Sequence, residues 1–247
     1  MALIAITSTT IWSSSISAKG NALLCEIPLG RDSLYETNIV GINTSGDSTP
    51  FVFSVAPNNE KFYEPLQNIG WLIAVPETLW AKPNGQTQPL KILTKFPGNP
   101  LLTNRHFSAS IIVRQASKGT ISLGVALKVR LETVASRLVP ENLNRLALIP
   151  SKISYNGDID SLYIFNGTKL VDTVEVYWTD HLGRKRNSEK VFLFRRILLW
   201  ELPLHTIFLE PKCGEWIFFK KNISEIDSHG YIVCNGRENY IYSRIGE

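Results

Sequence analysis

The side chains able to do nucleophilic, acid–base or metal chemistry are few and scattered along this chain. None of the four histidines shares a turn or a strand face with a cysteine or carboxylate at metal-ligand spacing. They are His106, His181, His205 and His229. No nucleophile elbow, phosphate loop or dinucleotide fingerprint occurs either. We therefore predict no catalytic residue, no metal, no cofactor and no enzymatic activity.

Three cysteines allow one pair and leave one thiol over. Cys213 and Cys234 could form a disulfide if the protein is exported, although their spacing alone does not establish the bond. With His229 the same two thiols could be drawn as a zinc site, but a fourth ligand is missing. Cys25 is expected to be a buried free thiol.

Composition favours a β-rich protein of two domains. The chain has 247 residues, 44% of them hydrophobic and 19% charged, with six Trp, eight Tyr and eleven Phe. The net charge of +4 is too small, and the basic residues too dispersed, for a nucleic-acid partner. No run of eighteen apolar residues predicts a transmembrane span. Residues 1–20 are either a degraded signal peptide or a frayed leading segment. Asn43, Asn166 and Asn222 fit the glycosylation pattern, which matters only in a eukaryotic secretory route.

The hydrophobic pattern predicts short strands separated by turn residues about every eight to twelve positions. In the first half these strands are 21–29, 36–43, 51–55, 70–75, 90–96, 107–115 and 121–133. In the second half they are 161–166, 172–178, 191–194, 197–202, 206–209, 215–220, 230–234 and 240–244. The fold class expected is all-β, two tandem immunoglobulin-like antiparallel sandwiches. The domains expected are 21–138 and 151–247, joined by a linker at 139–150, and 137–149 is the only plausible short helix.

The strand at 121–133 is unusually long, and its large apolar residues fall at every second position from Ile121 to Leu131. This period of two places them all on one face of the strand. On pattern alone, the strand either buries that face in a sandwich or offers part of it to another chain by strand addition.

Three segments resemble the N-terminal domain of PapD-like periplasmic pilus-assembly chaperones. The first is 75–92, a strand, a proline, a second strand and a turn that holds Pro83 and Gly85. The second is 102–113, similar to the loop and strand before the family's last hairpin, and the third is 121–133 itself. The second domain is similar only as a sandwich of the right size.

The resemblance implies that the last strand of the first domain is lent to a fibre subunit that lacks one of its own strands. Ile121, Leu123 and Val125 would be the apolar donor row, and Arg130 would be the basic anchor for the subunit's terminal carboxylate. The expected function is that of a periplasmic or extracellular chaperone that binds a protein partner by β-strand donation. The alternative is a structural or adhesive surface protein built of tandem immunoglobulin-like domains.

Overall fold

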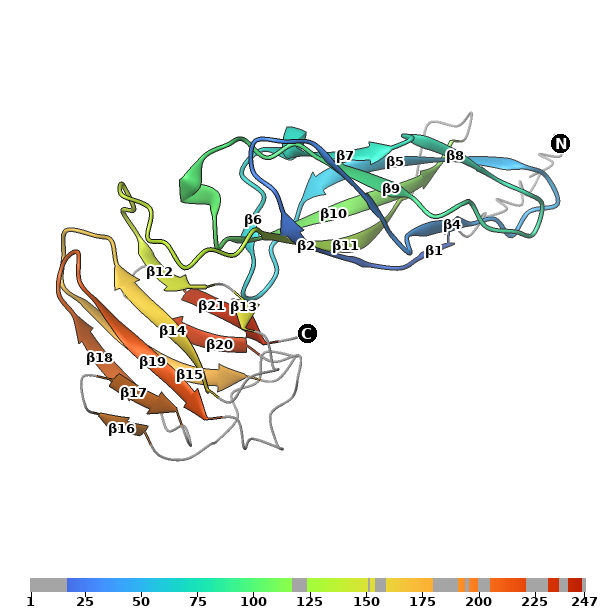
Figure 1. Ribbon diagram of the computed structural model, residues 1–247. Coiled ribbons are helices and arrows are strands. Elements are labelled where there is room, and N and C mark those ends of the chain that lie inside the picture. The colour runs from blue at the N-terminus through green and yellow to red at the C-terminus, as the bar shows by residue number, and fades with distance from the viewer. Residues whose placement is uncertain are drawn as a thin grey trace, which may run out of the picture.

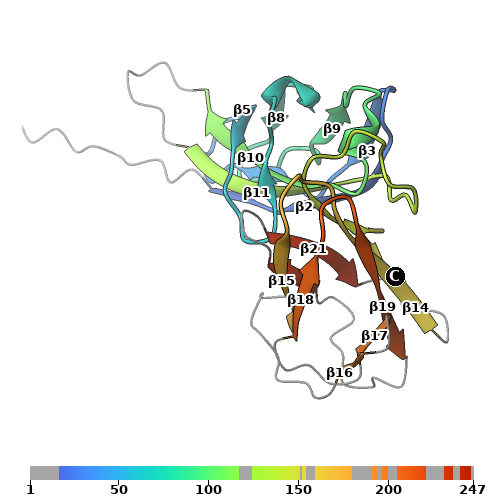
Figure 2. The same ribbon diagram turned by 90° about the vertical axis from the view of Figure 1, so that its left-hand side faces the viewer.

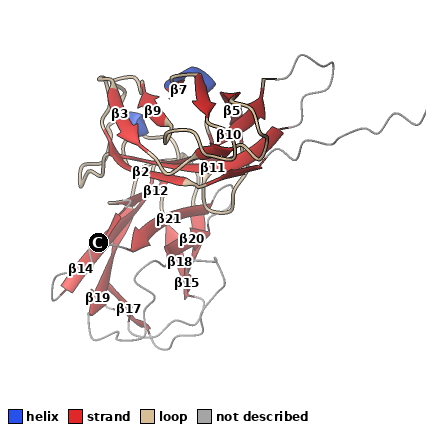
Figure 3. Ribbon diagram, turned by 90° about the vertical axis from the view of Figure 1, so that its right-hand side faces the viewer, coloured by secondary structure: helices blue, strands red, loops and turns tan. Residues whose placement is uncertain are grey.

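The computed structural model describes residues 17–116, 124–150, 152–153, 159–179, 191–193, 196–199, 205–220, 231–235 and 240–245. These residues form strands, together with two single-turn 3-10 helices, η1 (Ile69–Trp71) and η2 (Pro100–Leu102). Figure 3 shows the predominance of strand over helix. The predicted all-β fold class is therefore confirmed. Most of the expected leading segment, residues 1–16, lies outside the described residues.

Strands β1–β11 form the first sandwich (Figure 1). Its larger sheet has the order β2 (Ala22–Ile27), β11 (Gly124–Thr133), β10 (His106–Gln115), β5 (Thr49–Pro57) and β8 (Thr78–Ala81), and β6 (Glu64–Pro65) also pairs with β10. The second sheet has the order β3 (Ser33–Glu36), β9 (Lys91–Thr94) and β7 (Leu72–Val75). A short ribbon pairs β1 (Ser17–Lys19) with β4 (Val40–Ile42). Two antiparallel-rich sheets with this division are typical of immunoglobulin-like sandwiches.

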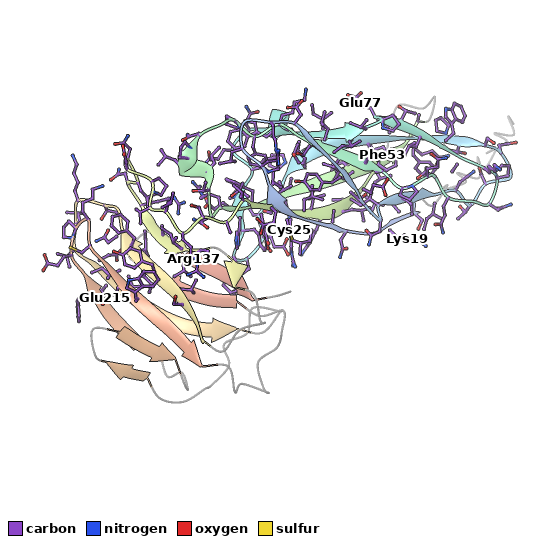
Figure 4. All side chains as sticks on the ribbon, viewed as in Figure 1. Lys19, Cys25, Phe53, Glu77, Arg137 and Glu215 are labelled. Atoms are coloured by element: carbon purple, nitrogen blue, oxygen red, sulfur yellow. The ribbon has the colours of Figure 1, made fainter. Side chains whose placement is uncertain are left out.

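The core of the first sandwich lies between these two sheets and takes side chains from both. Phe51, Phe107 and Ile111 come from the larger sheet and Ile92 from the smaller, and each is at most 1% exposed. The Phe107 ring centroid lies 5.7 Å from that of Phe96, which adds an aromatic contact to the area buried. Phe53, labelled in Figure 4, lies in the same core. Alternation of apolar and polar residues along the strands thus gives each sheet a core-facing apolar side.

Only Pro76 and Glu77 separate β7 from β8, yet the two strands belong to different sheets. The chain therefore crosses from one sheet to the other at this proline. Because proline has no N–H to give to a ladder, it suits the entry to an edge strand. The strand that follows, β8, is the edge strand of the larger sheet.

A buried asparagine closes the same kind of loop in each half of the chain. The Nδ2 amide of Asn43 donates to the carbonyls of Asp47 and Lys82, at 2.7 and 2.9 Å, and its Oδ1 accepts from Ser45.

The corresponding Nδ2 of Asn166 donates to the carbonyls of Leu170 and Leu209, at 2.8 and 3.0 Å, and its Oδ1 accepts from Thr168. Both Asn43 and Asn166 are at most 4% exposed, so the folded chain offers neither amide to a glycosylating enzyme. Asn222 lies outside the described residues.

Strands β12–β21 form the second sandwich, which lies below the first in Figure 2. One sheet has the order β12 (Leu146–Ile149), β14 (Ile159–Asn166), β19 (Gly214–Lys220), β17 (Arg196–Leu199) and β16 (Val191–Leu193). The other has the order β13 (Lys152–Ile153), β21 (Tyr240–Ile245), β20 (Tyr231–Asn235), β15 (Asp172–Thr179) and β18 (His205–Leu209). Among the described residues, no strand of one sandwich pairs with a strand of the other. The domain boundaries themselves stay a prediction.

The structure corrects one expectation at the junction. Residues 137–149 contain no helix, and their last four residues form the strand β12. All four residues of β12 are buried, and the strand pairs with β14. The sequence of a strand that is buried on both faces is a continuous apolar run. The hydrophobic period of such a run does not distinguish the strand from a buried helix.

Candidate protein-binding strand

The long strand predicted at 121–133 is present as β11, whose described part begins at Gly124. It pairs antiparallel with β10 over residues 124–132. Val129 and Leu131 have no exposed surface, and Leu127 packs against the core from a partly buried position. Val125 is partly exposed. The apolar row therefore enters the core at its C-terminal end and becomes accessible toward its N-terminal end.

The other side of β11 is covered over only part of its length. Strand β2 pairs with it in parallel from Val129 to Thr133. Before Ala22 the chain leaves this sheet, because β1 pairs with β4 instead. Within the described residues, positions 124–128 of β11 therefore pair with β10 alone; no strand pairs with their other edge, although β1 lies close to β11. We call residues 124–128 the open edge. Ile121 and Leu123 of the predicted donor row lie outside the described residues.

Arg130, the predicted anchor, is bound within its own chain. Its Nη2 and Nε donate to Oε1 of Glu60 at 2.6 and 3.2 Å, and Nζ of Lys128 donates to the same oxygen at 3.3 Å. The Glu60 side chain is only 9% exposed, whereas those of Arg130 and Lys128 are 36% and 63% exposed. Burial alone would raise the pKa of Glu60, but the hydrogen bond and charge of Arg130, with those of Lys128, outweigh it and lower the pKa.

The loop of residues 58–63, which joins β5 to β6, places Glu60 over the face of β11 that carries Lys128 and Arg130. The Ser108 hydroxyl donates to the Asn58 carbonyl at 2.8 Å and so ties the loop to β10. Ser108 and Ser110 lie opposite Arg130 and Lys128 in the ladder, and such small side chains leave room for the loop above them. The sequence did not indicate Glu60, because a charged residue in a polar turn is usually solvated.

A second buried carboxylate, that of Glu132, lies farther along the same face of β11 and is 3% exposed. The Tyr63 hydroxyl donates to its Oε1 at 3.3 Å, and the Cys25 thiol donates to its Oε2 at 3.5 Å. The Arg130 guanidinium lies over the Tyr63 ring, 5.3 Å from the centroid. Arg130 is thus held by both a carboxylate and an aromatic face, which fixes its orientation.

Another charged cluster lies where the two sandwiches meet. Arg105 forms a two-point ion pair with Glu64, donating from Nε at 2.6 Å and also from Nη2. Burial lowers the pKa of Arg145, which precedes β12, to about 10; nearby Arg105 acts in the same direction and Glu64 opposes it. Arg145 therefore stays charged at neutral pH. Its Nη1 donates to the Leu146 carbonyl at 3.1 Å. Arg145 therefore lies within electrostatic range of the Arg105–Glu64 pair, while its own hydrogen bond stays in the connection to β12. Arg137, labelled in Figure 4, lies in the connection between the two sandwiches.

The thiols of Cys213 and Cys25 differ in exposure. Cys213 is free and exposed, so the structure does not contain the Cys213–Cys234 bond that the sequence allowed. Cys213 precedes β19, whereas Cys234 lies in β20 of the opposite sheet, in register with Val176 and Ile241. Cys25 is partly buried, and its thiol donates to Glu132.

Neither a metal site nor a membrane-spanning helix is found in the part of the chain that the structure describes. There, no group of three or more His, Cys, Asp or Glu side chains could hold an ion. In the same residues, no helix combines the length and the apolar character needed to cross a bilayer.

The chain is similar in structure to proteins of the PapD-like class. The Pseudomonas aeruginosa CupB2 chaperone shares 13% identity, covering 90% of this chain and 97% of that one, at a TM-score of 0.30. The E. coli chaperone DraB shares 10% identity over 94% and 98% of the two chains, at 0.33. A PapD-like domain of human CEP192 shares 8% over 54% and 94%, at 0.36. No family model matches the chain, and no curated protein does.

These solved structures are of the class that the sequence was expected to resemble, at identities of 8–13% and TM-scores of 0.30–0.36. Likenesses of this size say nothing of what this chain itself binds.

Proposed function

We propose that this chain is a non-enzymatic binding protein that captures a partner protein by β-strand addition along the open edge of β11. The partner class that fits is a fibre or pilus subunit whose sandwich lacks one strand. The chain would act on it as an assembly chaperone outside the cytoplasm, in the periplasm or at the cell surface.

The observation that carries the proposal is the one-sided pairing of residues 124–128. Backbone N–H and C=O groups that point away from β10 along this edge are available to another strand, which would supply affinity through main-chain hydrogen bonds. Val125 is partly exposed on the apolar face of the same residues, and Ile121 and Leu123 precede it at the same period. Such side chains would fill a hydrophobic slot in the partner and supply specificity.

An exposed edge strand is an aggregation risk that folded proteins usually suppress with charge, proline or a covering segment. In the open edge only Lys128 is charged, and it is engaged by Glu60. Retention of an unprotected edge is easier to understand if another chain covers it in use. By the same reasoning, we propose a purely structural role for residues 129–133 of β11, which pair with β2.

Backbone hydrogen exchange on the isolated chain tests the open edge directly. We expect alternate amides of residues 124–128 to exchange fast, because only those facing β10 are bonded, and amides of 129–133 to exchange slowly throughout. Adding an incomplete fibre subunit should slow the fast set. Slow exchange at every amide of 124–128 without a partner would refute strand addition. It would favour the alternative of a structural or adhesive module whose edges are already paired.

A matched pair of variants tests the apolar row. Val125→Glu places a charge on the face proposed to enter the partner, whereas Ala126→Glu places the same charge one residue along, on the opposite face. We expect capture of a fibre subunit, measured by co-purification, to be lost only in Val125→Glu. Equal capture by both variants would contradict the proposed role of this face.

A further inference from the structure

The cationic pair on β11, Lys128 and Arg130, is already occupied by a carboxylate from its own chain. Three N–H groups converge on Oε1 of Glu60, at 2.6, 3.2 and 3.3 Å. Among the described residues, its other oxygen, Oε2, is buried and has no hydrogen-bond partner. A buried carboxylate oxygen without a donor is costly, so the two cations are what keep Glu60 in this position.

The arrangement differs from an exposed surface ion pair, which contributes little. Glu60 is 9% exposed, is held by two cations at once, and lies on a loop tied to β10 through Ser108. A carboxylate brought by a partner would have to displace that of Glu60, which belongs to the same chain as the two cations. Intramolecular attachment gives Glu60 an effective concentration of about millimolar or more, so an outside carboxylate starts at a disadvantage.

We propose that Glu60 is a specificity-determining residue: by occupying Lys128 and Arg130, it makes this chain select partner segments by their apolar side chains and not by a terminal carboxylate. The inference rests on the proposed strand addition, because it concerns the same edge of β11. It assigns to the 58–63 loop the role of an internal competitor at the cationic pair. Removing the Glu60 charge, with its shape retained, creates an anion site that the natural chain does not offer.

The first test needs no partner strand. The Arg130 Nε–Hε signal is followed by NMR while acetate is titrated into the natural chain and into Glu60→Gln, with chloride at equal ionic strength as the reference. We expect acetate to shift this signal in Glu60→Gln and leave it unchanged in the natural chain. The same response in both proteins would overturn the inference, whatever the fate of strand addition. Glu36→Gln is the matched control, because it removes a carboxylate paired with Lys91, which lies in the smaller sheet.

The second test uses a synthetic peptide in which valine alternates with threonine, made with either a free carboxylate or an amide at its C-terminus. The natural chain and Glu36→Gln should bind the two forms equally. Glu60→Gln should bind the acid about tenfold tighter than the amide, the size expected for a hydrogen-bonded charge pair. Adding Arg130→Met to Glu60→Gln should abolish the preference.

The outcomes separate the two proposals. If neither peptide form binds any of the proteins while acetate still shifts Arg130 in Glu60→Gln, strand addition fails and the occupancy of the cationic pair stands. If the natural chain already prefers the acid peptide by tenfold, Glu60 does not exclude a terminal carboxylate and the inference is overturned. Thermal unfolding of each variant, followed by far-ultraviolet circular dichroism, establishes that Glu60→Gln remains folded.

Discussion

Two valines on one face of β11 allow a direct test of how burial changes along the strand. Val125 and Val129 lie four residues apart on the same face of the strand. Val129 has no exposed surface, and Val125 is partly exposed beside the open edge. Replacing each by alanine removes the same atoms, so any difference between the two variants measures burial and not chemistry.

The expected magnitudes follow from that burial. At about 0.8 kcal/mol for each buried carbon group, removing two from Val129 costs about 1.6 kcal/mol in transfer free energy alone. The cavity left between the sheets adds to this, so Val129→Ala should lower the free energy of unfolding by about 2 kcal/mol or more. Val125 has less apolar surface to lose, and Val125→Ala should cost less than about 1 kcal/mol.

Urea-induced unfolding gives the comparison, with the amide signals of β10 as the probe so that only the first sandwich is followed. The midpoint of Val129→Ala should fall clearly below that of Val125→Ala while the dependence on urea concentration stays the same. Equal losses at the two positions would refute the reasoning. They would mean that Val125 is as deeply packed as Val129, and the accessible end of the apolar row would not exist.

Three further predictions concern single side chains. Because the pKa of Glu60 is lowered, its contribution to stability is present at neutral pH and is lost as the pH falls below the ordinary glutamate value of about 4.3. Urea unfolding at several pH values should therefore show that the stability of Glu60→Gln depends less on acid than that of the natural chain. An equal acid dependence in the two proteins would contradict this prediction. Asn43→Ala and Asn166→Ala should each lower the free energy of unfolding by about 1–3 kcal/mol, since each leaves partly or fully buried carbonyls without donors. A loss below experimental error would count against the shared loop. In the folded chain, Cys213 should react with a thiol reagent faster than Cys25, because Cys213 is the more exposed thiol. Mass spectrometry after brief labelling measures the two rates, and faster labelling of Cys25 would contradict the prediction.

Local patterns predicted most of the strands because they depend on neighbouring residues. The alternation in 107–115 is β10, and the apolar runs bounded by turn residues in the second half match β14, β15 and β19 within a few residues. Strand β12 was missed, because four consecutive buried residues carry no alternation. The role of Arg130 could not be predicted either, since its partner Glu60 is seventy residues away in the sequence.

The sequence by itself determined that this chain is all-β and that Ile121–Leu131 presents an apolar row, because side chains alternate across a strand whatever surrounds it. Only the tertiary structure decided which part of that row is available. Strand β2 covers residues 129–133 only, because the chain before Ala22 pairs with β4, and the 58–63 loop places Glu60 against Lys128 and Arg130. Both events depend on contacts between segments far apart in the chain, which the period of a single strand does not encode.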